Sequence, residues 1–381
     1  MDLTLSPADE AFRAEARTWL AAHVPRTPLP SLETGEGFAA HRVWEAELAA
    51  DRWSVVSWPE VYGGRGADIV RWLVFEEEYY AAGAPGRVGQ NGINLLAPTL
   101  FDHGTERQRA RILPSMATGE VVWAQAWSEP EAGSDLASLT SRAVRTDGGW
   151  LLSGQKAWSS RAAFADRAFG LFRSEPGTAR PHQGLTYLMF DLRAPGVTVR
   201  PVGRLDGRPA FAEVFLDEVF VPDEDLIGEP GGGWRVAMST AGNERGLTLR
   251  SPGRFLAAAD RLADLWRGRA DPSDTALRDR VADAVIGARA YQLFTYANAS
   301  RFLDGGTVGP ESSLNKVFWS EYDIALHETA LDLLGPDGES ADTDWSEGYV
   351  FSLAGPIYAG TNEIQRDIIA ERLLGLPKGR R

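Results

Sequence analysis

Two segments in the middle of the sequence combine small, hydroxyl-bearing and aromatic residues that suit ligand binding. The first, QAWSEPEAGSD from Gln125 to Asp135, places serine and glycine around a Glu-Pro turn. A backbone that approaches a ligand closely needs such residues, because glycine adds no side chain, and N–H groups and hydroxyls donate to phosphate or ring oxygens. The second, GQKAWSS from Gly154 to Ser160, sets an aromatic face beside two hydroxyls at the end of an expected strand. Each segment alone is also typical of an ordinary serine-rich turn.

Length and composition describe a globular protein of several domains. The 381 residues exceed what a single core usually supports and indicate two or three domains. Hydrophobic residues make up 44% and charged residues 24% of the chain, which is ordinary for a globular protein. The net charge of -14 argues against a nucleic-acid partner, because the sequence has no basic stripe that would neutralise a phosphate backbone.

Cysteine and histidine usage narrows the chemistry further. The absence of cysteine removes disulfides, thiolate metal sites and cysteine nucleophiles, and fits a reducing cytoplasm. The five histidines show no metal-ligand spacing, so no metal site is expected. The N-terminal residues lack a signal-peptide pattern and no apolar run reaches about 18 residues, so we expect a cytoplasmic protein without a membrane partner.

The periodicity of apolar residues predicts three domains and an α+β multidomain fold. Residues 1–122 read as an N-terminal all-α domain, in which Ser6-Pro7 starts a first helix. Apolar residues recur at helical spacing at Phe12, Ala16 and Trp19, and again at Ile69, Trp72, Leu73 and Tyr80. Between these two helices, WPEVYGG (58–64) reads as a connecting loop.

The middle of the chain, residues 123–231, changes to short strands between turn residues. The segments GWLLSGQKAW, GLTYLMFDL, VTVRPVGRL and AEVFLDEVFVP are the clearest strands. Their number and spacing predict a small antiparallel β-barrel or sandwich. The glycines at 231–233 then form a natural joint to the last domain.

The remaining residues, 232–381, predict a C-terminal four-helix bundle. One helix carries Val281, Val285 and Ala288 on an apolar face. Another carries an apolar stripe and stops at a Leu-Gly-Pro sequence. The members of that stripe are Leu314, Val317, Phe318, Tyr322, Ala325 and Leu326.

The motifs together resemble those of the acyl-CoA dehydrogenase family. They are WPEVYGG, SEPEAGSDLA, GQKAWSS and, near the end, IYAGTNEIQRDIIAERLLGLP (357–377), which follow the family's order over essentially the whole chain. The chain has no G-x-G-x-x-G after a strand and no Walker-type loop, so a redox cofactor would need a different architecture. The resemblance implies the three domains described above and FAD, held between the β domain and the bundle and reaching a neighbouring subunit.

The resemblance also assigns residues to the cofactor. In this assignment, Gln125, Ser128 and Ser134 contact the flavin ring edge and the pyrophosphate, Trp158 lies against the isoalloxazine ring, and Ser160 donates toward N5. From the C-terminal segment, Thr361 and Glu363 meet the FAD. Each of these residues is also typical of a turn or a strand end.

The reaction implied is removal of the α-proton of an acyl-CoA thioester and transfer of the β-hydride to flavin N5, which gives the 2-enoyl-CoA. Many members place the catalytic carboxylate directly before the Gly-Thr of the last motif, where this chain has Ala359. Others, similar to isovaleryl-CoA dehydrogenase, place it on the first helix of the bundle, where this chain has Glu244 followed by Arg245. We therefore expect Glu244 to be the base, although a surface carboxylate paired with arginine is the simpler interpretation. The backbone N–H of Ala359 would still hold the thioester carbonyl, and Arg245 would bind the thioester end or CoA phosphates.

Two departures concern the adenosine half of FAD. The family's arginine before a Phe-Gly pair has no clear counterpart here, and Arg267 or Arg269 would have to replace it. A glutamine before the Leu-Gly loop is replaced by Asp332. The sequence leaves open how the adenosine is anchored.

Substrate, partners and alternatives follow from the same resemblance. The small residues Thr240, Ala241 and Gly242 beside Glu244 favour a branched, cyclic or steroid-like acyl group, or else serve close helix packing. We expect an electron-transfer flavoprotein or similar acceptor, a role in lipid metabolism, and a homotetramer or a heterotetramer with a related chain. The alternatives are a flavin-binding partner subunit of a mixed tetramer, a related flavin oxygenase, or an enzyme acting on carrier-protein thioesters in biosynthesis.

Overall fold

The structure is a computed structural model that describes residues 4–245, 251–269, 271–306, 309–339 and 343–379. Backbone contacts divide the chain into two units that do not follow chain order. One, called here the sheet unit, contains Thr27–Gly66 and Pro85–Glu244. The other, called the bundle unit, contains Met1–Arg26, Ala67–Ala84 and Arg245–Arg381. The N-terminal helices are thus shared between the two units.

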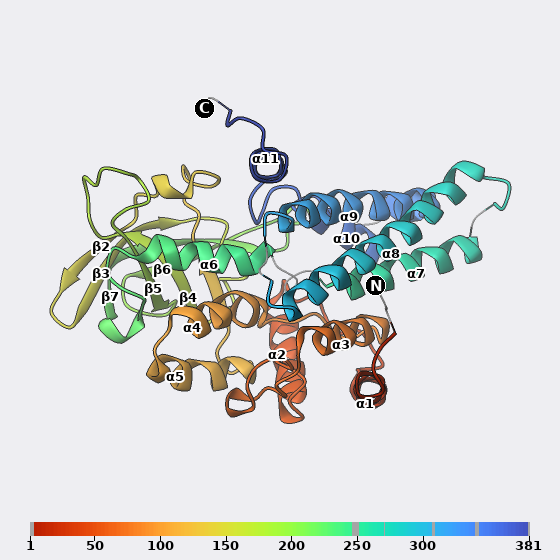
Figure 1. The fold of residues 1–381 in the computed structure, drawn as a ribbon, viewed down its shortest axis with the longest axis horizontal. Coiled ribbons are helices and arrows are strands. Elements are labelled where there is room, and N and C mark those ends of the chain that lie inside the picture. Colours follow the sequence, from red (N-terminus) through yellow and green to blue (C-terminus); the bar gives the residue numbers. More distant parts are fainter. Residues whose placement is uncertain (1–3, 246–250, 270, 307–308, 340–342, 380–381) are drawn as a thin grey trace. The chain divides into compact units, whose positions relative to one another are not determined.

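The sheet unit is built on one eight-stranded sheet (Figure 1). Its strands are β1 (Trp123–Ala126), β2 (Arg142–Thr146), β3 (Gly149–Lys156), β4 (Arg167–Arg173), β5 (Leu185–Asp191), β6 (Val197–Val202), β7 (Phe211–Pro222) and β8 (Leu226–Ile227). Their order is β6-β7-β3-β2-β4-β5-β8, with β1 paired to β4. The predicted β domain is confirmed. Its pairings are antiparallel except for β1 with β4 and one residue pair of β2 with β4, which are parallel.

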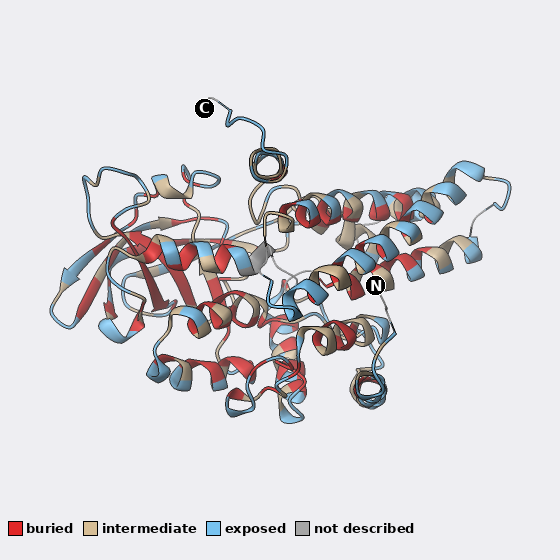
Figure 2. Ribbon diagram, in the orientation of Figure 1, coloured by how far each residue is buried: buried red, intermediate tan, exposed pale blue. Residues whose placement is uncertain are grey.

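Side-chain alternation explains why these segments form a sheet around a core. Along β7, the buried residues Ala212, Val214 and Leu216 alternate with partly exposed ones, as expected for a strand with one face on the core. In contrast, β5 is buried along nearly its whole length, so both of its faces are covered. In Figure 2 buried and exposed stretches both occur in the sheet.

Four helices belong to the sheet unit, namely α2 (Gly35–Ala50), α4 (Ala97–His103), α5 (Glu106–Ala117) and α6 (Gly233–Arg245), the last ending at the unit boundary. Between α2 and α4, the WPEVYGG segment forms a tight turn. Built on Gly64, a Cβ atom would lie 1.9 Å from the Trp58 carbonyl oxygen, so only glycine fits there. The loop expected from the sequence is therefore a fixed packing element.

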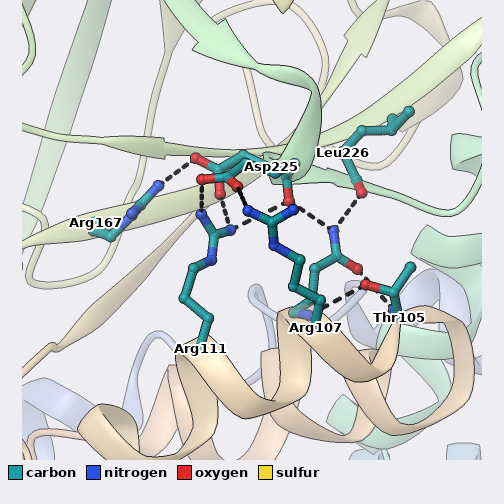
Figure 3. Close-up of polar contacts among 8 residues, drawn as sticks. Thr105, Arg107, Arg111, Arg167, Asp225 and Leu226 are labelled. Carbon is teal, nitrogen blue, oxygen red and sulfur yellow. Dashed lines mark hydrogen bonds and ion pairs between the residues drawn. The ribbon is translucent and has the colours of Figure 1, made fainter.

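Charged side chains anchor α5 to the connection between β7 and β8 (Figure 3). A capping box of Thr105 and Gln108 starts the helix, and the Gln108 side chain also donates to two carbonyl oxygens of this connection. Arg111 of α5 and Arg167 of β4 both pair with Asp225, which is 3% exposed. Two arginines on one buried carboxylate join helix and sheet within this unit.

The bundle unit contains seven helices among the described residues (Figure 1). They are α1 (Pro7–His23), α3 (Ile69–Ala81), α7 (Pro252–Arg269), α8 (Thr275–Leu303), α9 (Ser312–Leu334), α10 (Asp344–Ser352) and α11 (Asn362–Ile368). Its core is formed by Phe255, Leu262, Tyr291, Trp319 and Leu326, with smaller residues between them. The helices predicted at both ends of the chain are confirmed.

Helix α9 buries only part of the apolar stripe that the sequence predicts: Leu326 lies in the core and Tyr322 packs against it. Leu314 and Phe318 of the stripe are 39% and 40% exposed. The buried face instead carries Lys316, which donates to Asn362, and Asp323, which pairs with an arginine of α7. The predicted face is therefore wrong at Leu314 and Phe318, because polar and ionic contacts between helices bury other residues of α9, and periodicity alone does not reveal them.

Neither a membrane span nor a metal centre is found in the described ranges. Over these residues, no helix is long and apolar enough to cross a membrane. The same part of the chain has no group of three or more His, Asp or Glu side chains arranged to hold a metal ion.

Candidate active site

A buried ion pair joins the two motif segments of the sheet unit. Lys156, fully buried at the end of β3, donates from Nζ to Glu129 Oε1 at 2.9 Å and to the Leu171 carbonyl oxygen at 2.8 Å. Glu129, 5% exposed, also accepts from the backbone N–H groups of Thr140 and Ser141. Burial opposes the charge on Glu129, but the Lys156 ammonium and these donors outweigh it and lower the pKa of Glu129 to about 2. In turn, burial lowers the pKa of Lys156 to about 8.

Backbone contacts complete the connection between these segments. The Ala157 N–H donates to the Ser128 carbonyl oxygen at 2.8 Å, and Ser159 exchanges two backbone hydrogen bonds with Ala212. A Cβ atom on Gly154, whose φ is 146°, would lie 2.3 Å from Ser141 Oγ. Glycine is therefore required in GQKAWSS because the neighbouring chain passes so closely.

Trp158 sits in a strained backbone conformation and presents its ring to solvent. Its φ is 57°, in the left-handed region that bulky residues avoid at a cost of roughly 1–3 kcal/mol. The side chain is 63% exposed and meets Phe211 edge-on, with ring centroids 5.9 Å apart. Burial of the ring does not offset this strain; backbone hydrogen bonds of Ala157 and Ser159, on either side of Trp158, hold the conformation.

The other predicted site residues of the sheet unit are polar and differ in exposure. The predicted site residues Gln125, Ser128 and Ser160 are half-buried, and Ser134 is exposed. Ser159 is buried, and its hydroxyl has no hydrogen-bond partner among the described residues. The sequence analysis did not single out Ser159, Glu129 or Lys156, although all three lie inside the two motif segments.

The C-terminal motif of the bundle unit holds a second strained turn. Ala359 and Gly360 have φ angles of 56° and 77°, and the Gln365 side chain donates to both carbonyl oxygens at 3.0 and 3.3 Å. Thr361 caps α11, and Glu363 is exposed in its first turn. The pKa of Glu363 is lowered by its own backbone N–H and by Thr361. Gln365 thus fixes the orientation of the peptide groups at Ala359.

The expected base lies in the last turn of α6. Helix α6 includes Glu244 and Arg245, whose side chains are outside the described residues. One turn earlier, Thr240 and Ala241 are buried, and Thr240 bonds to Thr99 of α4. These two small residues therefore pack against neighbouring elements. This agrees with the interpretation that they serve close helix packing rather than a wide acyl-binding cavity. In contrast, a Cβ atom on Gly242 would meet nothing within 4 Å.

The residues considered for the adenosine half form surface ion pairs in the bundle unit. Arg267 pairs with Asp264 and Arg269 with Asp337. Asp332 pairs with Arg280. All six side chains are 41% or more exposed, so the pairs bring little stability of their own and leave these groups accessible.

Comparisons with known proteins identify the class of enzyme. Three family models match in sequence order: the N-terminal domain of acyl-CoA dehydrogenase over residues 6–120, the middle domain over 124–219 and the C-terminal domain over 231–374. The chain therefore belongs to the acyl-CoA dehydrogenase family and is an oxidoreductase of that class.

Individual relatives extend this result. The chain is 38% identical to acyl-CoA dehydrogenase IpdE1 of Mycobacterium tuberculosis, over 97% of this chain and 98% of the relative. Among solved structures, it resembles the Tcur3481-Tcur3483 steroid acyl-CoA dehydrogenase, with 28% identity, full coverage of both chains and a TM-score of 0.87. It also resembles the ChsE4-ChsE5 complex from Mycobacterium tuberculosis, with 28% identity, full coverage and a TM-score of 0.83.

Members of this family are flavoproteins that use FAD, and the residues of this chain fit that cofactor. Trp158 offers an exposed aromatic face, which suits a planar ring system. The orphaned Ser159 hydroxyl and the accessible Ser134 and Ser160 supply hydrogen-bonding groups in the same unit.

Proposed function

We propose that this protein removes the α-proton and the β-hydride of an acyl-CoA thioester and so forms the 2-enoyl-CoA, with Glu244 as the base. The observation that carries the proposal is the strained, exposed Trp158, which lies two residues after Lys156 of the buried Glu129–Lys156 pair. A protein that binds no planar ligand would gain nothing from this arrangement. When bound, FAD accepts the hydride at N5.

The residues proposed to contact the cofactor come from the two middle motif segments and from the C-terminal motif. In the sheet unit these are Gln125, Ser128, Ser134, Trp158 and Ser160. Their amide, hydroxyl and aromatic groups match the oxygen atoms and the plane of a flavin nucleotide. In the bundle unit they are Thr361 and Glu363.

Glu244 is the carboxylate proposed to take the α-proton. The methyl group of Ala359 cannot accept a proton, so the position used by many members is not available for this role. The Ala359 N–H would instead donate to the thioester oxygen, where negative charge develops as the α-proton leaves. Gln365 holds the neighbouring carbonyl oxygens and so preorganises this donor. Arg245 would bind the thioester end or the phosphates of CoA.

The test is anaerobic mixing of the FAD-loaded protein with a panel of acyl-CoAs while flavin absorbance is recorded. We expect wild-type flavin to bleach and Glu244→Gln to slow bleaching by about a hundred- to ten-thousand-fold with FAD still bound, since the amide keeps the volume and loses the base. Glu328→Gln, which changes an exposed carboxyl on α9, is the matched control and should react like wild type. Near wild-type bleaching by Glu244→Gln would show that the base lies elsewhere. Failure to bind FAD even on reconstitution would refute the proposal as a whole.

A second candidate function is a flavin-binding subunit of a mixed tetramer. It is favoured by two structural relatives whose names each join two proteins, Tcur3481-Tcur3483 and ChsE4-ChsE5. Asp332 replaces the glutamine that the resemblance implies for the adenosine half, and a related chain would supply that contact. Purification from the native host, followed by mass spectrometry of the intact assembly, distinguishes a tetramer of one chain from a mixed one.

Substrate and setting form the last part of the proposal. We propose a branched, cyclic or steroid-like acyl group, supported by the relative described as a steroid acyl-CoA dehydrogenase. The packing of Thr240 and Ala241 means that these residues add no support to it. We also propose that the protein works in the cytoplasm, because the chain has no cysteine. Its electron acceptor would be an electron-transfer flavoprotein or a similar protein.

A further inference from the structure

Four side chains of the sheet unit form an unbroken hydrogen-bonded chain from the first motif segment to α6. Trp127 Nε1, just after β1, donates to the hydroxyl of Tyr187 in β5 at 3.2 Å. That hydroxyl lies 3.2 Å from Thr240 Oγ1 in α6, which lies 2.7 Å from Thr99 Oγ1 in α4. Thr99 Oγ1 lies 2.7 Å from the Leu95 carbonyl oxygen. The three hydroxyl-bearing residues are completely buried.

The direction of donation along this chain is fixed at both ends. An indole N–H only donates, and a carbonyl oxygen only accepts. Each hydroxyl has one proton, so every contact has a donor only if Tyr187 donates to Thr240, Thr240 to Thr99, and Thr99 to Leu95. The Thr240 hydroxyl also donates to the Val236 carbonyl oxygen at 3.1 Å, so three hydroxyl protons serve four contacts and Thr240 divides its proton between Val236 and Thr99. Each of the three buried hydroxyls nevertheless has a hydrogen-bond partner in another element.

Two further contacts locate α6 within the sheet unit. At its start, a Cβ atom on Gly233 would lie 2.7 Å from the Leu185 carbonyl oxygen, so the helix begins directly against β5. Near its end, Ser239 Oγ donates to Asp102 of α4 at 2.8 Å. Thr240 is the point at which both α4 and β5 hold the helix, one turn before Glu244.

We infer that Thr240 is a positioning residue, whose hydroxyl fixes the last turn of α6, and with it the backbone of Glu244, relative to the segment that begins at Trp127. This inference rests on the proposed function, in which that segment holds the flavin and Glu244 takes the proton. A base must be placed within a fraction of an ångström of its target, and misplacement by about 1 Å costs up to about a hundredfold in rate. The buried hydroxyl chain links α6 to the segment that begins at Trp127 and so limits movement of the Glu244 backbone relative to that segment.

The test compares Thr240→Val, which keeps the shape and removes the hydroxyl, with Thr240→Ser, which keeps the hydroxyl. Thr295→Val is the matched control, because Thr295 is also completely buried in a helix but bonds only to the Tyr291 carbonyl oxygen one turn earlier. We expect Thr240→Val to slow flavin reduction by about ten- to a hundredfold, with KM and FAD content little changed. Thr240→Ser should restore most of the rate, and Thr295→Val should leave it unchanged.

Backbone amide exchange supplies a readout that does not require activity. Thr240→Val should speed hydrogen–deuterium exchange in the peptide that ends α6 by about fivefold, the factor expected for the loss of one hydrogen bond, while Thr295→Val should not.

If Thr240→Val does not fold, Tyr187→Phe breaks the same hydrogen-bonded chain at its other end. Its effect should be smaller, because the Tyr187 contacts are longer than the Thr99–Thr240 contact.

Three results would overturn the inference. The first is an unchanged rate of flavin reduction and unchanged amide exchange in Thr240→Val, and the second is a loss of rate in Thr240→Ser equal to that in Thr240→Val. The third applies if Tyr187→Phe replaces Thr240→Val and is an unchanged rate and exchange in Tyr187→Phe. If wild-type flavin is not reduced by any acyl-CoA, the proposed function fails. The exchange experiment still decides whether Thr240 holds the end of α6. The two failures are therefore distinguishable.

Discussion

Replacing Lys156 by methionine should destabilise the sheet unit strongly, because it leaves the Glu129 carboxylate buried without its counter-charge. The pKa of Glu129 is lowered from 4.5 to about 2 in the folded protein. Each pH unit by which a pKa is lowered corresponds to about 1.4 kcal/mol, so the lowered pKa of Glu129 corresponds to about 3 kcal/mol of stabilisation. The Lys156 ammonium contributes a large part of it. Removal of one partner from a buried pair costs about 3–5 kcal/mol in general. The carboxylate keeps its donors Thr140 and Ser141, so we expect the lower end, about 3 kcal/mol.

Urea unfolding of wild type and Lys156→Met between pH 2 and 7 measures this loss. Because the folded pKa of Glu129 lies below its unfolded value, its stabilisation is complete above about pH 4.5 and is lost as pH falls toward 2. The gap between wild type and variant should therefore be largest above pH 4.5 and narrow below it. Lys378→Met, at an exposed position, is the control and should change stability by less than about 0.5 kcal/mol.

A double variant separates charge from packing. Lys156→Met with Glu129→Gln removes both charges, so it should be more stable than Lys156→Met alone, since the unpaired carboxylate is gone. A loss below about 1 kcal/mol in Lys156→Met, or a gap that does not depend on pH, would refute the reasoning.

Two further predictions concern assembly and substrate. The purified protein should sediment as a tetramer, alone or with a related chain, and a monodisperse monomer that holds FAD and turns over would contradict this. Steady-state assays should give higher kcat/KM for branched or ring-bearing acyl-CoAs than for butyryl-, octanoyl- or palmitoyl-CoA; a clear preference for any of these straight chains would show that the proposed substrate class is wrong.

The sequence by itself determined the class of fold and the segments of the site. Short segments rich in β-branched and aromatic residues, set between turn residues, predicted the strands that became β3, β5, β6 and β7, because such side chains pack well on a pleated surface. The motif segments predicted the family, since their glycines and hydroxyls are local requirements of the backbone and of a ligand. The missing carboxylate at Ala359 and the presence of Glu244 were likewise visible in the sequence.

Only the tertiary structure decided which polar residues are buried and what they hold. Lys156 and Glu129 read as ordinary charges in the sequence, yet they form the core of the connection between the two motif segments. The apolar Phe318 of α9 is exposed, whereas Asp323 on the same helix is buried against Arg254. The hydroxyl of Thr240 likewise has a role only in the folded protein, where it is hydrogen-bonded to Thr99 of α4 and Tyr187 of β5. A buried charge or hydroxyl is tolerated only where partners from distant parts of the chain satisfy it, and no local pattern records those partners.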